Sequence, residues 1–318
     1  MKRQSILVLA IASSVLYSLD SKTSLADWMT LDKPGATWTF IHGIDGTNIV
    51  GSFFDDAASR YSGFLYDRSS HTWTILDADD SDLTSAHGIH GSKIVGTYRT
   101  SGTFYDHGFL YDTSTDIWIT LDADPLGALD TVAKDIHGNK IVGYYITSGA
   151  SHDFCGFVYD HITAAWTGLN PPAPGGPPTI ANGIDGGNIV GSSNFHGFLY
   201  DGTNRTFLDM PGADVTKAIG IDGSNIVGLW YHSGLGDPDF CMDHGFLYDG
   251  MNWTTLDFPG AAQTVLSDIQ GKEIVGYYED ASGDYHGLIY TIPAPSAVLL
   301  GSIGLSVSGW LLRRCRTL

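Results

Sequence analysis

Six imperfect copies of one unit, whose hairpins begin 37 to 48 residues apart, fill the chain from residue 28 to residue 291. Each unit joins a hairpin of the type GIDGTNIVG to an element GFLYD and an element WTTLD. The hairpins occupy residues 43–51, 88–96, 135–143, 183–191, 220–228 and 268–276. The GFLYD elements occupy 63–67, 108–112, 156–160, 197–201, 245–249 and 287–291, and the WTTLD elements 28–32, 73–77, 118–122, 166–170, 205–209 and 253–257. Such a repeat restricts the chain to folds that stack like units.

The three elements have the composition of short β-strands. β-Branched and aromatic residues dominate them, and Gly, Asp and Asn mark the joints. The Asp-Gly pairs supply the positive φ that a tight antiparallel turn needs. We therefore expect four strands in each unit: strands a and b form the hairpin, strand c is HGFLYD and strand d is WTxLD. No apolar period of 3.6 residues predicts a helix outside the two termini.

The phase of the repeat favours a ring. One four-stranded sheet cannot bury its own faces, and a β-propeller solves this by packing sheets around an axis, which leaves only short edges. The repeats begin with a strand d, Trp28 to Asp32, and end with a strand c that has no strand d behind it. We expect an all-β, six-bladed propeller of four-stranded antiparallel blades, with the ring closed by the N-terminal strand. A β-solenoid, the competing fold, has no use for this phase.

The N-terminus carries an export pattern. Residues 1–26 contain two basic residues, an apolar run and a Ser-Leu-Ala sequence that ends at Ala26. This order is typical of a cleavable secretory signal. The propeller is then expected to occupy residues 27–292, followed by a tail at 293–318.

The tail contains Pro293 and Pro295, an apolar stretch at 297–312, and a cluster of arginines. The stretch is shorter than the ~20 residues of a usual membrane span, but the basic residues after it fit positive-inside anchoring. This layout resembles the PEP-CTERM sorting tail, although Ala294 stands where that motif has Glu. The resemblance implies export, transient inner-membrane anchoring, removal of the tail by a sorting enzyme of that membrane, and delivery to the surface or extracellular matrix of a Gram-negative bacterium. An ordinary single-span anchor is the alternative.

The repeats resemble the bacterial extracellular repeats named for a His-Ala-Phe (HAF) motif. His196-Gly197-Phe198 and His244-Gly245-Phe246 occupy that motif with Gly in place of Ala. The resemblance covers the whole propeller region and implies no particular activity. We expect the histidines of this motif to be structural, with side chains that bond the backbone of a neighbouring blade.

Without the two ends the chain is strongly acidic. The remaining 10 basic and 34 acidic residues give a net charge near −24, which disfavours nucleic acid and anionic membranes as partners. Cys155 and Cys241 fall in blades that do not touch, so no disulfide between them is expected.

Strand a carries one residue that all six copies share, a Thr five positions before the Ile of the hairpin. Innermost strands line a propeller's channel, so these hydroxyls form a candidate ring for binding a sugar or an ion. Alternatively, each hydroxyl ties down its own d-to-a loop, as Thr commonly does at turns. The six residues are Thr39, Thr84, Thr131, Thr179, Thr216 and Thr264.

Three residues further along strand a the copies differ. This variety is what a ligand site in the channel would show, or simply a solvated pore. The matched positions hold His42, His87, Lys134, Asn182, Ile219 and Ser267.

The b-to-c loops and d-to-a connections are expected on one face, and their varied lengths favour that face as the place of function. The longest of these loops holds His232, Asp237, Asp239 and Asp243. Carboxylates can ligate Ca²⁺ and imidazoles can ligate transition metals, but the spacing matches no EF-hand or zinc pattern. The sequence therefore predicts an acidic surface loop without a metal or cofactor, and Ca²⁺ is the alternative.

No motif identifies a reaction: a Gly-x-Ser-x-Gly elbow, a His-Glu-x-x-His pair and a phosphate loop are all absent from the sequence. We expect a binding or structural module of the cell surface or extracellular matrix, with polysaccharide or a surface protein as partner and no catalytic residues. The alternative is an extracellular propeller hydrolase or lyase acting on glycans or esters. A tight cluster of Asp, His and Lys at the channel mouth would favour the enzyme, and a smooth Thr-lined mouth would favour binding.

Overall fold

The computed structural model describes residues 27–147, 153–169, 178–234 and 242–293. Apart from Pro293, these residues belong to one compact unit, Ala26–Ile292. The predicted signal and most of the predicted tail, with Ala26 and Pro295, lie outside the described residues. Within the described ranges, no helix has the length and apolar character needed to cross a bilayer.

The described strands fall into six four-stranded groups, which we number along the chain. Group 1 contains β2 (Thr39–Asp45), β3 (Asn48–Asp55), β4 (Arg60–Asp67) and β5 (Thr72–Leu76). Group 2 contains β6 (Ser81–His90), β7 (Lys93–Thr100), β8 (Asp106–Asp112) and β9 (Ile117–Leu121). Group 3 contains β10 (Ala128–His137), β11 (Lys140–Thr147), β12 (Phe154–Asp160) and β13 (Ala165–Gly168), preceded by a 3₁₀ turn at Asp124–Leu126.

The second half of the chain repeats this order. Group 4 contains β14 (Thr179–Asp185), β15 (Asn188–Ser193), β16 (His196–Tyr200) and β17 (Arg205–Leu208). Group 5 contains β18 (Val215–Asp222), β19 (Asn225–Tyr231), β20 (His244–Tyr248) and β21 (Trp253–Thr255). Group 6 contains β22 (Gln263–Gln270), β23 (Glu273–Glu279), β24 (Tyr285–Thr291) and β1 (Asp27–Thr30).

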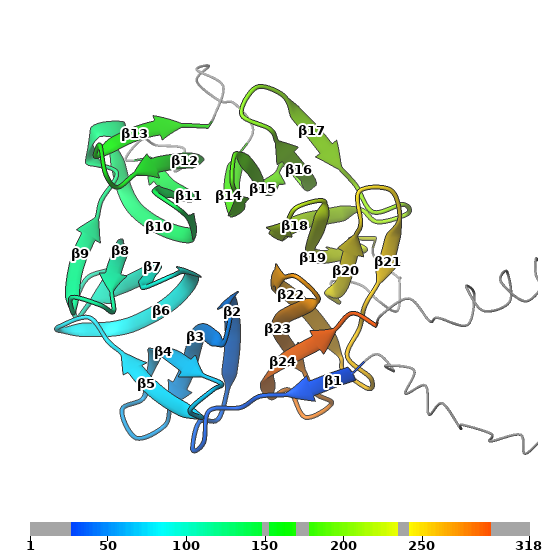
Figure 1. Ribbon diagram of the computed structural model, residues 1–318, viewed down its shortest axis with the longest axis horizontal. Coiled ribbons are helices and arrows are strands. Elements are labelled where there is room, and N and C mark those ends of the chain that lie inside the picture. The colour runs from blue at the N-terminus through cyan, green and yellow to red at the C-terminus, as the bar shows by residue number, and fades with distance from the viewer. Residues whose placement is uncertain (1–26, 148–152, 170–177, 235–241, 294–318) are drawn as a thin grey trace, which may run out of the picture. The chain divides into compact units, whose positions relative to one another are not determined.

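Neighbouring strands within every group are antiparallel, and the groups lie side by side around a common centre (Figure 1). Groups 1 and 2 form one continuous eight-stranded sheet because a single parallel pair, Tyr61 with Leu83, joins β4 to β6. In group 6, β1 pairs antiparallel with β24, and Trp28 lies opposite Tyr290. The predicted all-β chain of four-stranded antiparallel sheets is confirmed, and the N-terminal strand pairs with the last strand as the phase of the repeat predicted.

The a-to-b turns show why the hairpin motif needs glycine. Each turn places one glycine at a φ of 58 to 60°, in the left-handed region that L side chains rarely adopt. A second glycine, in strand b, is required by close approach: a Cβ on Gly51 would lie 2.0 Å from the Phe40 carbonyl oxygen and 2.7 Å from the Phe64 ring. The repeated Gly residues therefore serve the backbone path and the packing of strand c.

The hydrophobic core is divided into six clusters, each of which is shared by two groups that are neighbours. The Phe of strand c is fully buried, as Phe64 and Phe198 show. Trp73 of strand d packs beside Phe64, whereas Arg205 lies over the Phe198 ring in group 4. One cluster joins Ile41 and Phe64 of group 1 to Val275 and Ile289 of group 6. Burial of such side chains contributes about 1.5 to 3 kcal/mol each, so the clusters between groups stabilise the fold.

The histidines before Gly-Phe are structural, as expected, but their predicted partner is wrong. Each Nδ1 pairs with the Asp that ends strand d of its own group, at 2.8 to 3.0 Å, and not with the backbone of a neighbour. The antiparallel pairing of strands c and d places that carboxylate beside the ring. The pairs are His107 with Asp122, His196 with Asp209, His244 with Asp257 and His286 with Asp32.

Candidate functional site

Every strand a contains a β-bulge at the same place. In β2 the register shifts between Ile41 and Gly43, so His42 has no partner on β3. A bulge turns the extra residue out of the alternating pattern of the strand and re-aims its side chain. The six bulged residues, which we call the bulge layer, are His42, His87, Lys134, Asn182, Ile219 and Ser267.

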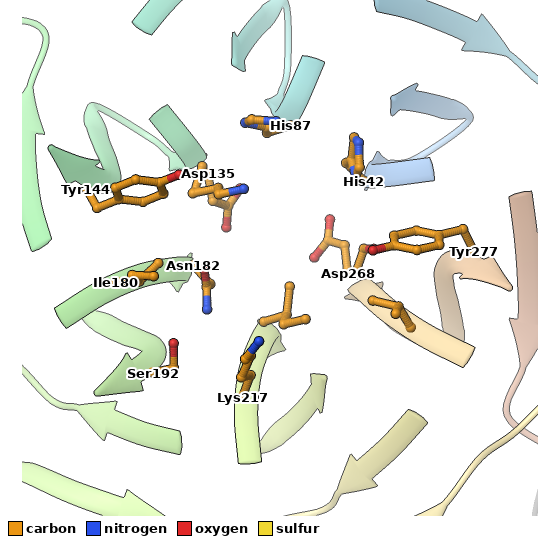
Figure 2. Close-up of a pocket in the computed structure, with 14 residues that line it drawn as sticks. His42, His87, Asp135, Tyr144, Ile180, Asn182, Ser192, Lys217, Asp268 and Tyr277 are labelled. Atoms are coloured by element: carbon orange, nitrogen blue, oxygen red, sulfur yellow. The ribbon is translucent and has the colours of Figure 1, made fainter. Parts of the chain in front are cut away.

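All six residues of the bulge layer line one central cavity of about 270 Å³. These are the varied positions of strand a, so the structure brings together the residues that the sequence singled out as a possible ligand site. Figure 2 shows His42, His87 and Asn182 around this cavity, with Lys217 of β18 across it from His87. Tyr144 and Tyr277 line it from strands b of groups 3 and 6.

The two histidines of the bulge layer are neutral. His87 Nδ1 donates to the carbonyl oxygen of Ala133 at 2.8 Å, which leaves Nε2 as an acceptor. His42 Nε2 lies 3.2 Å from Ser52 Oγ, and its ring centre lies 5.3 Å from that of His87. Burial, followed by the charge of Lys134, lowers the pKa of His42 to about 3 and lowers that of His87 well below its usual range. Both rings can therefore act as hydrogen-bonding groups at neutral pH.

Two lysines in the cavity have no ion-pair partner among the described residues. Lys134 makes neither a hydrogen bond nor a salt bridge, and burial lowers its pKa to about 8, so it stays mainly charged at neutral pH. Lys217 Nζ lies 5.6 Å from the centre of the Tyr231 ring, and its charge acts on the Asp243 carboxylate without forming a salt bridge. By contrast, Arg60, Arg68 and Arg99 all pair with carboxylates elsewhere in the protein.

Two carboxylates, Asp135 and Asp268, lie one residue beyond the bulge on opposite sides of the cavity (Figure 2). Asp135 accepts hydrogen bonds from the backbone N–H groups of Ile136 and Ile184, and Asp268 accepts them from Ile269 and Ile44. Each carboxylate thereby joins its group to the next one. Burial raises the pKa of both.

The sequence analysis missed Asp135 and Asp268, although a signal was present. The other four copies have Gly at this position, where a Cβ would lie 2.4 to 2.7 Å from the neighbouring strand. The hairpins DIHGNKIVGYY and DIQGKEIVGYY depart from GIDG together, and both also place a Tyr after the Gly of strand b. The same two groups therefore supply an Asp and a Tyr to opposite walls of the cavity.

The far end of the channel, where the a-to-b turns meet, is acidic. A second cavity of about 130 Å³ lies there, and its lining includes no lysine or arginine among the described residues. Three of its carboxylates latch one turn to the next, for example Asp45 Oδ2, which accepts from Gly91 N at 2.6 Å. Its acidic residues are Asp45, Asp135, Asp185, Asp222 and Asp268.

The six threonines that all copies of the repeat share do not line the cavity, which corrects their assignment as a ring of binding hydroxyls. Each is at most 2% exposed. Five of the hydroxyls accept a hydrogen bond from the backbone N–H just after strand d, at 2.9 to 3.2 Å, as Thr131 does from Ala123. We call these residues the threonine layer; they hold the d-to-a connections, which was the alternative reading. They are Thr39, Thr84, Thr131, Thr179, Thr216 and Thr264.

The loop predicted as a possible Ca²⁺ site is described only in part, because Asp237 and Asp239 lie outside the described residues. His232 Nδ1 is 4.0 Å from Asp214 Oδ2, and Asp243 lies where burial raises its pKa and the charge of Lys217 partly offsets that rise. Neither residue lines the central cavity. Within the described ranges, no three His, Cys, Asp or Glu side chains come together as metal ligands.

An aromatic cluster, which we call the aromatic shelf, lies beside the cavity on groups 1 and 6. Phe40 contacts Tyr277 and Tyr285 with ring centres 5.0 Å apart, and Tyr277 itself lines the cavity. All its members are half-buried, so each keeps an accessible part of its ring. The shelf consists of Trp38, Phe40, Phe54, Tyr61, Tyr277 and Tyr285.

The fold is that of known β-propellers. A scan against protein-family models and a search of curated proteins find no match. Among solved structures, the chain is similar to an acylaminoacyl peptidase of Pyrococcus horikoshii, with 12% identity, a TM-score of 0.51, and coverage of 84% of this chain but 46% of that one. It is also similar to the β-propeller domain of the Trilobed protease from Pyrococcus furiosus, with 10% identity, a TM-score of 0.48, and coverage of 82% and 85%. TolB from Acinetobacter baumannii gives 15% identity, a TM-score of 0.47, and coverage of 80% and 66%. At this identity the likeness concerns the fold alone.

Proposed function

We propose that the protein is an exported six-bladed propeller, closed by β1, that binds an extracellular glycan at the mouth of its channel. The observation that carries this proposal is the central cavity of about 270 Å³, lined by six varied bulge residues and continued outward by the aromatic shelf. In this proposal each group is one blade, and the core clusters that neighbouring groups share, including groups 6 and 1, support a closed ring.

The chemistry of this mouth suits a sugar. Flat aromatic faces pack against the apolar face of a pyranose ring, while neutral imidazole, amide and hydroxyl groups hydrogen-bond its hydroxyls. His42, His87 and Asn182 supply the polar groups, and Tyr277 joins them to the shelf. A surface protein is the other partner that the acidic, exported chain suits.

The predicted address is part of the proposal. The signal at 1–26 and the sorting tail at 293–318 imply delivery to the cell surface by an inner-membrane sorting enzyme. Cell fractionation tests this part: we expect the protein in the surface or extracellular fraction, and recovery from the cytoplasm alone would contradict export.

Glycan binding is tested with the purified full-length chain on a panel of bacterial surface oligosaccharides. We expect selective binding that weakens about tenfold when Tyr285→Ala removes one ring of the shelf. Removal of an aromatic side chain on which a nucleic-acid base stacks costs about 1 to 3 kcal/mol, and we take the lower part of that range for a sugar. A matched control is Phe207→Ala, which truncates an exposed aromatic of strand d in group 4. Equal loss in both variants would contradict a shelf-based site.

An extracellular hydrolase or lyase is the second candidate, and the cluster of Asp, His and Lys in the cavity favours it. His87 Nε2 is an unprotonated acceptor that could serve as a base, with Lys134 nearby. The carboxylates fit poorly as acid and base, because Asp135 and Asp268 each already accept two backbone hydrogen bonds. Release of new reducing or unsaturated sugar ends that His87→Gln abolishes would establish the enzyme; binding without turnover would reject it.

A further inference from the structure

The central cavity holds cationic groups that the protein itself does not neutralise. The propeller region has 10 basic residues against 34 acidic ones, and four of the basic residues pair with carboxylates at its surface. Lys134 and Lys217 both line the one central cavity, yet neither has a carboxylate within 4.0 Å among the described residues. In so acidic a chain, an unpaired lysine beside buried groups is costly unless something else supplies the anion.

The two ends of the channel differ in charge, and this gives the anion a direction. Lys134 and Lys217 lie at the level of the bulge layer, together with neutral His42 and His87. The turn end is lined by carboxylates without lysine or arginine among its described residues. An anion is therefore repelled from the turn end and attracted from the end that carries the aromatic shelf.

The carboxylates within the cavity leave this attraction largely intact. Asp135 and Asp268 each accept two backbone N–H hydrogen bonds, burial raises the pKa of both and so reduces their negative charge, and both also line the turn-end cavity. At the shelf end, the charge of Asp243 acts on Tyr277 and Tyr285 and that of Glu279 acts on Tyr285. Lys217 partly compensates Asp243, although no salt bridge joins them. Lys134 and Lys217, both on strands a, thus line the cavity as cations without a salt bridge among the described residues.

We infer that the channel mouth selects an acidic glycan, a uronic-acid sugar whose carboxylate is held by Lys134 while its ring packs against the aromatic shelf. This ligand class rests on the proposed function and narrows it. His87 Nε2 and Asn182 are placed to bind the neighbouring hydroxyls, and Lys217, two groups further on, adds a second positive charge to the cavity lining.

The test uses alginate, polygalacturonate and hyaluronan oligosaccharides, each beside its carboxyl-reduced form, titrated into the full-length protein by calorimetry. At least one acidic oligosaccharide is expected to bind about tenfold or more tightly than its reduced form, with an affinity that falls as salt is added. Lys134→Met should lower the affinity for the acidic form to that of the reduced form, while Lys134→Arg should restore part of it.

Lys140→Met is the matched control, because it removes the same charge from an exposed lysine at the turn end of the same group. Thermal melting of both variants separates loss of the site from loss of the fold. Equal binding of acidic and reduced glycans, or equal loss in Lys134→Met and Lys140→Met, would overturn the acidic ligand while glycan binding stands. Absence of binding to either form of every glycan would overturn the proposed function itself and this inference with it.

Discussion

Two layers of the same six strands, three residues apart, have opposite roles. The threonine layer is identical in every copy, fully buried and hydrogen-bonded to the backbone. The bulge layer holds five different residue types in six copies, is half-buried except for the buried Ser267, and lines the central cavity. In a repeat protein, a residue common to all copies serves what the copies have in common, which is the fold. A position whose residue differs between the copies is not required by the fold and can contact a ligand.

The largest effect is expected from deletion of β1, which tests whether this strand completes group 6. Deletion of residues 27–32 removes β1, its pairing with β24, and the contact of Trp28 with Tyr290. We expect the free energy of unfolding to fall by several kcal/mol and the melting temperature by on the order of 10 °C. Unchanged melting, followed by circular dichroism, would show that β1 does not close the ring.

Thr131→Val tests the threonine layer. It keeps the shape of the side chain but leaves the buried N–H of Ala123 without its acceptor, so we expect a loss of about 1 to 3 kcal/mol in stability. Ligand affinity of the folded protein should stay within about twofold, and Thr131→Ser should recover most of the stability. Lys134→Met, three residues further along β10, should instead lower ligand affinity and leave the stability nearly unchanged. A Thr131→Val protein that is stable but no longer binds would break the comparison between the layers.

Asp135→Gly puts the majority residue of the repeat at a charged position. Burial raises the pKa of Asp135 above its usual value, so the folded state binds a proton more tightly than the unfolded state. Stability contributed by this group is therefore present at low pH and is lost as pH rises from about 4 through neutrality.

Asp135→Gly removes this group, so the fall in the free energy of unfolding between about pH 4 and neutrality should be smaller by on the order of 1 kcal/mol. Urea unfolding of the variant should therefore depend less on pH. The slope of the free energy of unfolding against pH is compared between the two proteins, and this slope does not contain the pH-independent cost of placing Gly in a strand. Parallel pH profiles for the two proteins would contradict the assignment.

The smallest effect concerns His286, which joins β24 to the end of β1. Burial lowers its pKa, but hydrogen bonds and charges of Asp32 and Asp280 outweigh this and raise the pKa above 6.5. The stabilisation is then fully present below about pH 6.5 and is lost as pH rises through the folded pKa. Because the pair is substantially exposed, we expect less than about 1 kcal/mol. His286→Gln should melt closer to the unaltered protein at about pH 8 than at about pH 5.5.

Much of the fold was predictable from the sequence because it rests on local signals. The glycines of the hairpin turns, the alternation in strand c and the phase of the repeat identified the strands, their antiparallel order and the pairing of Trp28 with the last strand. These features depend on backbone conformation and burial, which the residue type at each position dictates.

The candidate site was predictable in part. The varied positions of strand a predicted His42, His87, Lys134 and Asn182, and all of them line the cavity. The threonines were misplaced because period-two alternation does not reveal a bulge, and the bulge decides which side chain faces the channel. Asp135 and its counterpart in group 6 were visible only as departures from GIDG.

By itself, the sequence determined the number and kind of repeated strands, the residues that turn and pack them, and the net negative charge. The tertiary structure alone decided which charges meet. Lys134 and Lys217 lie in different repeats, and the aromatic shelf draws Phe40 and Tyr285 from opposite ends of the chain. Such contacts follow from the arrangement of the groups around a common centre and from the bulge in each inner strand, which are set by packing between groups that no local stretch of sequence encodes.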